Sequence, residues 1–434
     1  MEKIKIGLLG IGTVGGGVWE ILQTNKEEII KNCGCEIEVE KILVRDANKK
    51  RDTSIPQGKF TSDFDEILQN KEIQILVEVM GGIEPAREYI LKAIKAGKHI
   101  VTANKALLAQ HGVEISQAAL DRGVKLYYEA SVAGGIPIIH PLKESLGGNK
   151  IQKIMGILNG TTNYILTKMT NEKVDFATVL KEAQDKGYAE ADPTADIEGF
   201  DAAHKLTILS TLAFGTPVKF EDVYREGITK ITPMDIEYAR ELGYAIKLLA
   251  IGKEEEDGLE LRVHPTFIAK DHPLASVNDS FNAVFVKGNA VGDLMFYGRG
   301  AGDLPTGSAV VGDIMSIVKA MGNKEILKDG FTQDLSKKVK SVSDIEGEYY
   351  LRLVVEDNPG VLGKIANLFG VNNVSLSSVI QKGESVSPVS LVFITHVAKE
   401  GDIQATLQEI KSMKEVVEIS NLIRVENGRE RGEA

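Results

Sequence analysis

Residues 3–15, KIKIGLLGIGTVG, decide the fold of the N-terminal part of the chain. A short apolar strand pattern runs into three glycines at positions 10, 12 and 15, and an amphipathic helical pattern follows them. In this context the first glycine allows a tight turn, the second lets the backbone approach a pyrophosphate, and the third allows close helix packing. The pyrophosphate then meets a helix N-terminus, where unpaired N–H groups favour an anion. The predicted cofactor-binding residues of this turn are Gly10, Gly12, Thr13, Val14 and Gly15.

The alternation of strand and helix continues to about residue 130. Strand patterns at 36–44, 73–79, 99–103 and 124–130 are separated by helical patterns. This alternation predicts right-handed crossovers and a doubly wound parallel sheet, with ligands bound beyond the carboxyl ends of its strands. We therefore predict an α/β fold in which residues 1–130 form a Rossmann domain and a helix within 306–330 returns to it.

Composition excludes several classes of protein. The 434 residues are 43% apolar and carry 51 Lys and Arg against 62 Asp and Glu, a net charge of −11 that disfavours nucleic acid as a partner. No apolar run approaches the roughly 20 residues of a membrane span, and the N-terminus lacks the pattern of a signal peptide. We expect a cytoplasmic location and no membrane partner.

Two further domains are predicted beyond residue 130. Residues 131–305 combine Gly/Pro-rich passages, helices and later strands, which indicates a second, α+β domain with a mixed sheet. We expect the substrate site and the dimerisation contact to lie in this domain. The polar stretch 335–348 is typical of a linker. Residues 349–426 show the order βαββαβ of a ferredoxin-like module. Ionisable residues are not clustered along that module, so we place catalysis elsewhere.

Three residues after strand patterns are candidates to contact a cofactor. Arg45 stands where many dinucleotide folds carry an acidic residue on the ribose, and with Lys49 and Lys50 nearby it favours NADPH. A solvated basic loop explains it as well, and Asp46 leaves NADH open. Met80, with Gly81 and Gly82, follows the strand at 73–79 and is placed to touch the cofactor through its backbone, although an ordinary strand-end turn is the alternative. Lys105 opens a helix, where a cation opposes the helix dipole and calls for an anionic or polarised partner, although a surface lysine is the alternative.

The segment 185–201 holds six carboxylates, which by itself is typical of a solvated acidic turn. Asp201 and Lys205, however, lie one helical turn apart, off the apolar stripe of their helix. An exposed pair at this spacing stabilises a helix by only about 0.3–0.5 kcal/mol. In a cleft the same pair could bind a substrate and exchange a proton, because desolvation lowers the pKa of a lysine.

Other chemistries are disfavoured. The seven histidines show no zinc-protease grouping, and neither a G-x-S-x-G elbow nor a Walker A loop occurs. Cys33 and Cys35 follow the first helix and are interpreted as free thiols. An aldehyde dehydrogenase that forms an acyl phosphate would need a nucleophilic cysteine near the substrate domain, so we reject that alternative.

Several long motifs resemble one family, homoserine dehydrogenase. The matching stretches are GLLGIGTVGGGV (7–18), VTANKALLA (101–109), YYEASVAGGIPII (127–139), GILNGTTNYIL (156–166) and GYAEADPTADIEGFDAAHKL (187–206). The C-terminal unit, with EDNPGVLGKIA at 356–366, resembles an ACT domain. The resemblance implies reversible, NAD(P)-dependent reduction of L-aspartate 4-semialdehyde to L-homoserine, in the pathway to threonine, isoleucine and methionine.

The resemblance also implies roles for individual residues. Lys205 would donate a proton to the aldehyde oxygen during hydride transfer, with Asp201 and Glu190 as catalytic partners. The residues implied to hold the substrate are Glu190, Asp192, Asp196, Asp201 and Lys105. The residues implied to lie against the nicotinamide half of the cofactor are Lys105, Gly187 and Gly302.

A cation and an effector are implied only by the resemblance. Oxygens of Glu129, Val132, Gly134 and Ile136 would bind sodium, although a Gly-rich hinge explains these residues equally well. The ACT domain is associated with feedback by threonine, and a homodimer or homotetramer is expected. The alternative from another class is a non-catalytic protein that senses a nucleotide and an amino acid, which the intact Asp201/Lys205 pair disfavours.

Overall fold

The computed structural model describes residues 3–51, 54–322, 336–382 and 388–427. The chain divides into two compact units, one formed by 1–151, 204–221 and 282–336, the other by 152–203, 222–281 and 337–434. Across the described ranges, no helix combines the length and apolar character needed to cross a bilayer.

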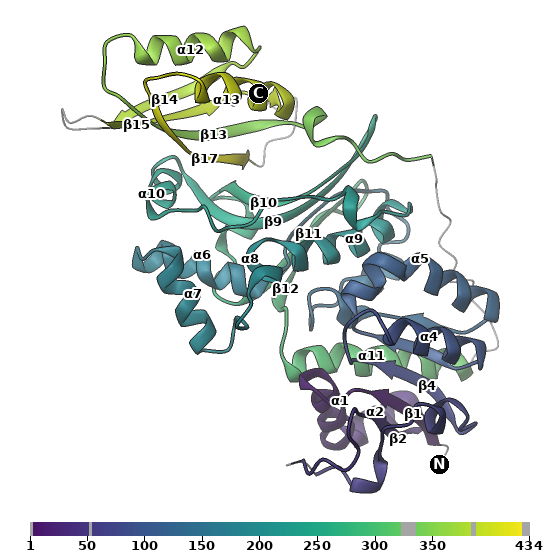
Figure 1. Ribbon diagram of the computed structural model, residues 1–434. Coiled ribbons are helices and arrows are strands. Elements are labelled where there is room, and N and C mark those ends of the chain that lie inside the picture. Colours follow the sequence, from purple (N-terminus) through teal and green to yellow (C-terminus); the bar gives the residue numbers. More distant parts are fainter. Residues whose placement is uncertain (1–2, 52–53, 323–335, 383–387, 428–434) are drawn as a thin grey trace. The chain divides into compact units, whose positions relative to one another are not determined.

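The first unit is built on a six-stranded parallel sheet (Figure 1). Its spatial order, β3-β2-β1-β4-β5-β6, reverses direction between β1 and β4, which is where ligands bind in such sheets. This topology confirms the Rossmann fold. The strands are β1 (Lys3–Leu9), β2 (Glu36–Leu43), β3 (Phe60–Thr61), β4 (Ile73–Glu78), β5 (His99–Thr102) and β6 (Leu126–Tyr127).

Helices of the first unit follow these strands, and α11 (Asp303–Gly322) packs on α1 (Thr13–Thr24) through glycines. A Cβ atom at Gly17 would lie 2.2 Å from the Asp303 carbonyl oxygen, so only glycine permits this approach. The remaining helices are α2 (Lys26–Cys33), α3 (Asp65–Leu68), α4 (Ala86–Lys95) and α5 (Lys105–Arg122). The strands β11 (Phe281–Gly288) and β12 (Gly292–Arg299) are sheet neighbours that precede α11.

The second unit carries a mixed sheet, which confirms the predicted α+β character. β9 (Tyr244–Glu255) runs antiparallel to both β7 (Ile151–Ile157) and β10 (Gly258–Ala269), whereas β8 (Tyr224–Arg225) pairs with β10 in parallel. The helices are α6 (Gly160–Glu172), α7 (Phe176–Asp185), α8 (Thr194–Ile197), α10 (Pro233–Glu241) and the first residues of α9 (Phe200–Phe214).

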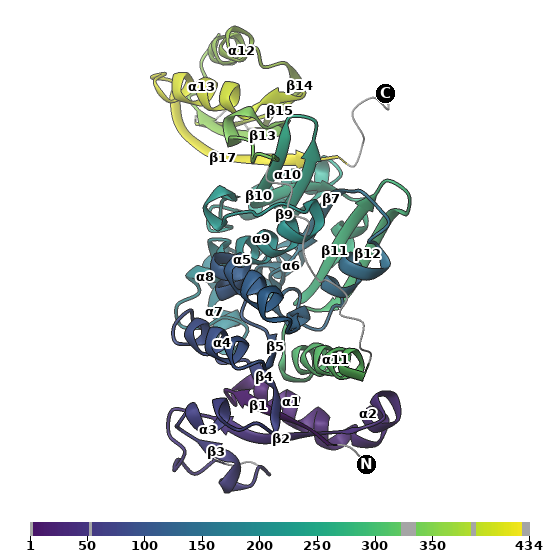
Figure 2. The same cartoon turned by 90° about the vertical axis from the view of Figure 1, so that its right-hand side faces the viewer.

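The C-terminal part of the second unit has the βαββαβ order of an ACT domain. Its sheet runs β17-β13-β15-β14, and α12 and α13 lie together on one face of it (Figure 2). The elements are β13 (Glu346–Val355), α12 (Val361–Val371), β14 (Leu376–Lys382), β15 (Val389–Thr395), β16 (Ala398–Lys399), α13 (Glu400–Lys411) and β17 (Val416–Glu426). The end of β17 also pairs in parallel with β10, with Thr266 opposite Arg424.

Some expected boundaries differ from those of the structure. The strand expected at 124–130 was too long, because only β6 pairs and a single helical turn follows at Glu129–Ser131. The stretch expected to be a linker is partly structured. The N–H of Leu259 donates to the carbonyl oxygen of Lys338, and the N–H of Lys340 donates to the carbonyl oxygen of Leu259, each at 2.8 Å. Residue 335 of that stretch and residues 323–330 of the returning helix lie outside the described residues.

Candidate active site

The glycine-rich turn joins β1 to α1. Gly10 has a φ of +102°, and its N–H donates to the carbonyl oxygen of Leu43 at 3.0 Å. A Cβ atom at Gly15 would lie 2.4 Å from the Gly10 carbonyl oxygen, so the turn itself requires glycine there. A Cβ atom at Gly12 would meet nothing within 4 Å, which leaves this backbone open to an approaching ligand.

The start of α1 is suited to an anion. Gly12 is the N-cap, no side chain caps the helix, and the first turn from Thr13 and Val14 contains no acidic residue. By contrast, Asn104 caps α5 by accepting a hydrogen bond from the N–H of Leu107. The unpaired N–H groups of α1 are therefore available to a pyrophosphate.

Arg45 lies exposed two residues beyond β2. The neighbouring carboxylate of Asp46 accepts hydrogen bonds from the N–H groups of Asn48 at 2.9 Å and Lys49 at 3.2 Å, within its own turn. The guanidinium of Arg51 donates to the Asp46 carbonyl oxygen at 2.8 Å and closes the loop. Within the described residues 44–51, the loop thus presents a cation, whereas the carboxylate of Asp46 is engaged locally.

The loop after β4 and the start of α5 meet at the same edge of the sheet. A Cβ atom at Gly10 would lie 3.1 Å from the Cα of Met80, so this loop touches the glycine-rich turn. The Asn104 side-chain amide donates to the Gly82 carbonyl oxygen at 2.6 Å, which ties the loop to the helix that begins at Lys105. The structure therefore brings together Gly10, Met80 and Lys105.

The predicted catalytic pair lies on α9. Asp201 and Lys205 are one turn apart and are 5% and 7% exposed, so the pair is not a surface ion pair. The side-chain amide of Asn159 donates to the carboxylates of Asp196 at 2.7 Å and Asp201 at 2.8 Å. Asn159 thereby joins two of the predicted substrate residues.

Sequence reasoning missed Asn159, although its signal was present. Its side chain also accepts a hydrogen bond from the N–H of Thr162 at 2.8 Å and so caps α6. Asparagine immediately before a helical pattern is a common N-cap. The additional bonds to carboxylates 37 and 42 residues away arise only from the fold.

The other residues predicted in the acidic segment lie on its exposed part. Glu190 is exposed, and Asp192 accepts a hydrogen bond from the N–H of Thr194 at 3.1 Å. Hydrogen bonds from the Thr194 hydroxyl and N–H lower the pKa of Asp192. Gly187, with a φ of +75°, follows α7, and Gly302, with a φ of +118°, precedes α11.

The candidate cation loop is buried and strongly bent. The Glu129 carboxylate accepts hydrogen bonds from three consecutive N–H groups, those of Ile138, Ile139 and His140, at 2.5 to 2.7 Å. No backbone N–H of the described residues donates to the carbonyl oxygens of Val132, Gly134 or Ile136. Main-chain oxygens therefore remain for a cation, whereas the carboxylate is already engaged.

An ion pair next to this loop was not predicted. His140 contacts the carboxylate of Asp313 at 2.9 Å, and the second oxygen of Asp313 accepts the Glu129 N–H at 2.8 Å. The hydrogen bond to Asp313 raises the pKa of His140. Glu129, His140 and Asp313 lie close enough to hold a metal ion, but their hydrogen bonds to one another and to the backbone already account for this cluster.

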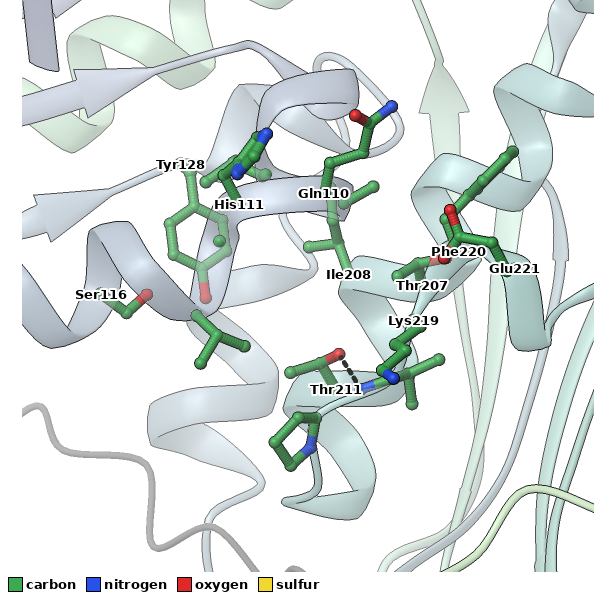
Figure 3. Close-up of a pocket in the computed structure, with 16 residues that line it drawn as sticks. Gln110, His111, Ser116, Tyr128, Thr207, Ile208, Thr211, Lys219, Phe220 and Glu221 are labelled. Atoms are coloured by element: carbon green, nitrogen blue, oxygen red, sulfur yellow. Dashed lines mark hydrogen bonds between the residues drawn. The ribbon is translucent and has the colours of Figure 1, made fainter. Parts of the chain in front are cut away.

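A cavity of about 540 Å³ lies between α5 and the segment 207–221 (Figure 3). Leu108 on α5 and Ile208 on α9 line it, each one turn beyond the lysines at 105 and 205. Tyr128 and Thr211 add polar atoms, and the Thr211 hydroxyl accepts a hydrogen bond from the N–H of Val218 at 3.2 Å.

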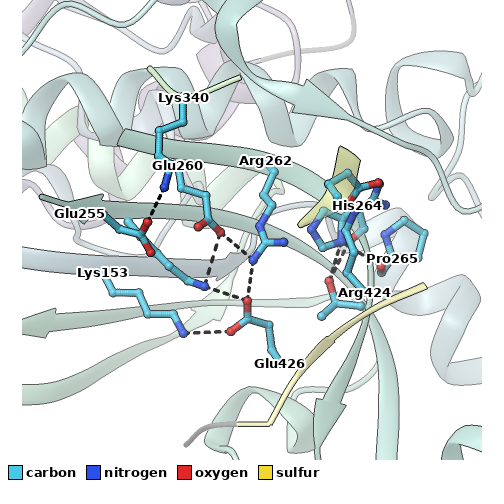
Figure 4. Close-up of polar contacts among 12 residues, drawn as sticks. Lys153, Glu255, Glu260, Arg262, His264, Pro265, Lys340, Arg424 and Glu426 are labelled. Atoms are coloured by element: carbon cyan, nitrogen blue, oxygen red, sulfur yellow. Dashed lines mark hydrogen bonds and ion pairs between the residues drawn. The ribbon is translucent and has the colours of Figure 1, made fainter. Parts of the chain in front are cut away.

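A buried polar network joins the ACT domain to β10 (Figure 4). The carboxylate of Glu426 accepts hydrogen bonds from Lys153, Lys253 and Arg262 at 2.8 to 3.1 Å. Burial alone would raise the pKa of Glu426, but these cations outweigh it and hold the pKa well below its usual range. Arg424 forms ion pairs with Glu400 and Glu226, each at 2.7 Å.

Three family comparisons cover most of the chain. Residues 10–129 match the homoserine dehydrogenase NAD-binding domain, residues 137–315 match homoserine dehydrogenase, and residues 349–415 match the ACT domain. The chain is 49% identical to homoserine dehydrogenase of Synechocystis sp. over 435 residues, which covers 97% of this chain and 99% of the relative. It is 42% identical to homoserine dehydrogenase of Bacillus subtilis, over 98% of this chain and 99% of the relative.

Solved structures agree. The crystal structure of a homoserine dehydrogenase from Thiobacillus denitrificans matches with a TM-score of 0.93 and 44% identity, over 98% of this chain and 99% of that one. A hyperthermophilic archaeal homoserine dehydrogenase in complex with NADPH matches with a TM-score of 0.62 and 27% identity, over 75% of this chain and all of that one. The alternative of a non-catalytic sensor receives no support from these matches. Together with the Rossmann turn and the buried Asp201/Lys205 pair, they show that the chain belongs to the homoserine dehydrogenase family of NAD(P)-dependent oxidoreductases.

Proposed function

We propose that Lys205 is the proton donor in the reduction of L-aspartate 4-semialdehyde to L-homoserine. A bound nicotinamide cofactor would supply hydride to the aldehyde carbon. The Lys205 ammonium would give a proton to the oxygen that gains negative charge. The reverse reaction returns that proton to the amine. The observation that carries this role is the burial of Lys205 and Asp201 on adjacent turns of α9, where a surface ion pair would be exposed.

The substrate carries both an ammonium and a carboxylate, so its site needs groups of both signs. Asp201, held by Asn159, and Glu190 are proposed to bind the ammonium group. Asp196, which shares the Asn159 amide with Asp201, and Asp192, which accepts the N–H of Thr194, are proposed to hold the substrate nearby. Lys105 is proposed to contact the substrate and the nicotinamide half of the cofactor, and Gly187 and Gly302 are proposed to bind that half as well.

The preferred cofactor is proposed to be NADPH. The glycine-rich turn and the uncapped start of α1 suit its pyrophosphate, and Arg45 suits the 2′-phosphate. Among the described residues of this loop, the acidic side chain that could bind a ribose hydroxyl is that of Asp46, and its own turn already engages it. The archaeal relative with bound NADPH supports the same choice.

A sodium ion is proposed to bind main-chain oxygens of Glu129, Val132, Gly134 and Ile136. The carbonyl oxygens of the last three receive no backbone N–H of the described residues, and hard oxygen ligands are the donor set that such a cation requires. The ion would stabilise the bend of this loop, in which Ala133 and Gly134 have φ angles of 55° and 54°.

The ACT domain is proposed to bind threonine and to act on the substrate segment. Arg424 of β17 pairs with Glu226, and the adjacent Arg225 lies 4.0 Å over the ring of Phe200, the residue before Asp201. A Cβ atom at Gly227 would lie 2.3 Å from the Ile197 carbonyl oxygen, so this segment packs tightly against the acidic loop. A homodimer or homotetramer is proposed as the assembly.

The role of Lys205 is tested by Lys205→Ala, with Lys219→Ala as an exposed control. We expect kcat to fall by about 10²–10⁴-fold, the contribution of a general acid, while the Kd for NADPH changes little. Near-normal turnover of Lys205→Ala would remove it from this role.

The proposed route from the ACT domain is tested by Glu226→Gln with threonine titration of the full chain. A truncation before residue 340 is less informative, because it would remove Glu426 from Lys153, Lys253 and Arg262. We expect the threonine concentration that gives half-inhibition to shift by about fivefold or more, the usual size of an allosteric coupling. Unchanged inhibition would exclude Glu226 from the route.

A further inference from the structure

A buried carboxylate lies beneath the loop that touches the glycine-rich turn. Glu78 ends β4 in the middle of the parallel sheet and is 0% exposed. Within the described ranges, no Lys, Arg or His forms an ion pair with it. Burial raises the pKa of Glu78, while its hydrogen-bond donors act to lower it. A buried carboxylate without a cation is costly and needs a reason.

The hydrogen bonds of Glu78 run to two separate segments. One carboxylate oxygen accepts the N–H of Met80 at 2.9 Å and the N–H of Gly81 at 3.1 Å. The other oxygen accepts the hydroxyl of Thr102, at the end of β5, at 2.6 Å. One side chain therefore holds the ends of two neighbouring strands.

The network continues to the start of α5. The Thr102 hydroxyl oxygen accepts the N–H of Asn104 at 3.1 Å. The Asn104 side chain caps α5 through the N–H of Leu107 and donates to the Gly82 carbonyl oxygen at 2.6 Å. The loop 80–82 and the first turn of α5 are thus joined twice, once through Glu78 and Thr102 and once through Asn104.

This arrangement restricts what the loop can offer a ligand. The N–H groups of Met80 and Gly81 point to Glu78, so they are not available to the cofactor. The left-handed φ angles of Gly81 and Gly82, +73° and +76°, permit the tight bend that this requires. Because Met80 also packs on Gly10, the position of the loop affects the glycine-rich turn as well.

We propose that Glu78 is a positioning residue, which fixes the loop 80–82 against the first turn of α5 and so sets the geometry of the cofactor site. It acts through Met80 and Lys105 and touches neither cofactor nor substrate. The inference rests on the proposed function in one respect, the contact of Lys105 with the cofactor.

The test compares Glu78→Leu with Glu78→Gln in the full-length enzyme. Leucine releases both loop N–H groups, and we expect the Kd and KM for NADPH to rise by about tenfold or more, with kcat at saturating cofactor changed much less. Glutamine can still accept both N–H groups with its carbonyl oxygen and donate to Thr102, so its KM should stay within about threefold of wild type. NADPH binding of Glu78→Leu equal to wild type would overturn the proposal.

A second pair of variants separates positioning from folding. Thr102→Val breaks the link to α5, whereas Thr61→Val removes a buried hydroxyl at the end of β3 that bonds to Asp63 and Glu66, away from the glycine-rich turn. We expect both variants to lower Tm by similar amounts. Thr102→Val should also raise the KM for NADPH, whereas Thr61→Val should leave it unchanged. If both variants lower Tm alike and neither changes KM, Glu78 is only a structural residue.

Lys105→Met distinguishes failure of this inference from failure of the proposed function. It leaves the Glu78 hydrogen bonds intact. If Lys105→Met binds NADPH normally while Glu78→Leu does not, the role of Lys105 is wrong and that of Glu78 stands. The converse result would retain Lys105 and reject Glu78.

Discussion

Asp235 of α10 binds three side chains of the ACT strands. Its side chain is 0% exposed and lies in α10, where Thr232 caps the helix. It accepts hydrogen bonds from Arg352 at 2.7 Å, Tyr350 at 3.0 Å and Asn421 at 3.0 Å, all from ACT strands. Asp235→Asn would leave the guanidinium of Arg352, 7% exposed, without its counter-ion. Breaking such a buried pair costs about 3–5 kcal/mol.

Differential scanning calorimetry would measure this loss. At about 2–4 °C per kcal/mol for a folding unit of 150–250 residues, Asp235→Asn should lower Tm by about 6–20 °C. Asp257→Asn is the matched control, because Asp257 is 67% exposed beside Lys340 and should cost less than about 1 kcal/mol. A Tm for Asp235→Asn within about 2 °C of wild type would refute the reasoning.

A double variant and a pH series test the cause of the loss. Asp235→Asn combined with Arg352→Met removes both charges and should be more stable than Asp235→Asn alone. Burial acts to raise the pKa of Asp235, but the hydrogen bond and charge of Arg352 outweigh it, and the net pKa is lowered. Its contribution is therefore complete above the unfolded pKa of about 3.9 and is lost as pH falls through the folded pKa. Asp235→Asn should lack this acid-dependent loss.

Three other predictions concern the cofactor and a buried lysine. Arg45→Asp should weaken the binding of NADPH far more than that of NADH in fluorescence titrations. Equal effects on the two cofactors would contradict the proposed contact of Arg45 with the 2′-phosphate. Gly12→Ala should keep its Tm and lose cofactor affinity, whereas Gly15→Ala should lower Tm, because only the second Cβ meets backbone within 4 Å. Burial lowers the pKa of Lys247 to about 8, so stability should rise between pH 8 and about 10.4. Lys247→Met should flatten that rise in the free energy of unfolding, measured with urea at a series of pH values. An unchanged dependence on pH would contradict this role of Lys247.

The candidate site was predictable where its determinants are local. The turn at 10–15 is contiguous, and Asp201 and Lys205 are related by helical spacing, so both follow from short-range pattern. The role of Asn159 is different. Its N-cap position can be read from sequence, but its bonds to Asp196 and Asp201 depend on how α6 packs beside the acidic loop.

The ACT domain shows the limit more clearly. Its charged residues are scattered along the sequence, so no cluster was predicted from them. The fold nevertheless brings Arg424 and Glu426 of β17 together with residues of β7 to β10. Strand pairing brings them together, because β17 adds in parallel to β10 at Thr266. Partner choice between strands depends on packing of whole faces, which a linear pattern does not contain.

The sequence by itself determined the Rossmann turn, the order of the three folds and the spacing of the proposed catalytic pair, because each is encoded by residues close along the chain. Only the tertiary structure decided that Glu78 holds two strand ends, that Asn159 joins two carboxylates, and that Asp235 anchors the ACT strands. These are buried polar groups that, besides partners within a few residues, have partners 24 to 186 residues away. A buried polar group must be satisfied by whatever donors the fold brings to it, and only the packed structure defines which donors those are.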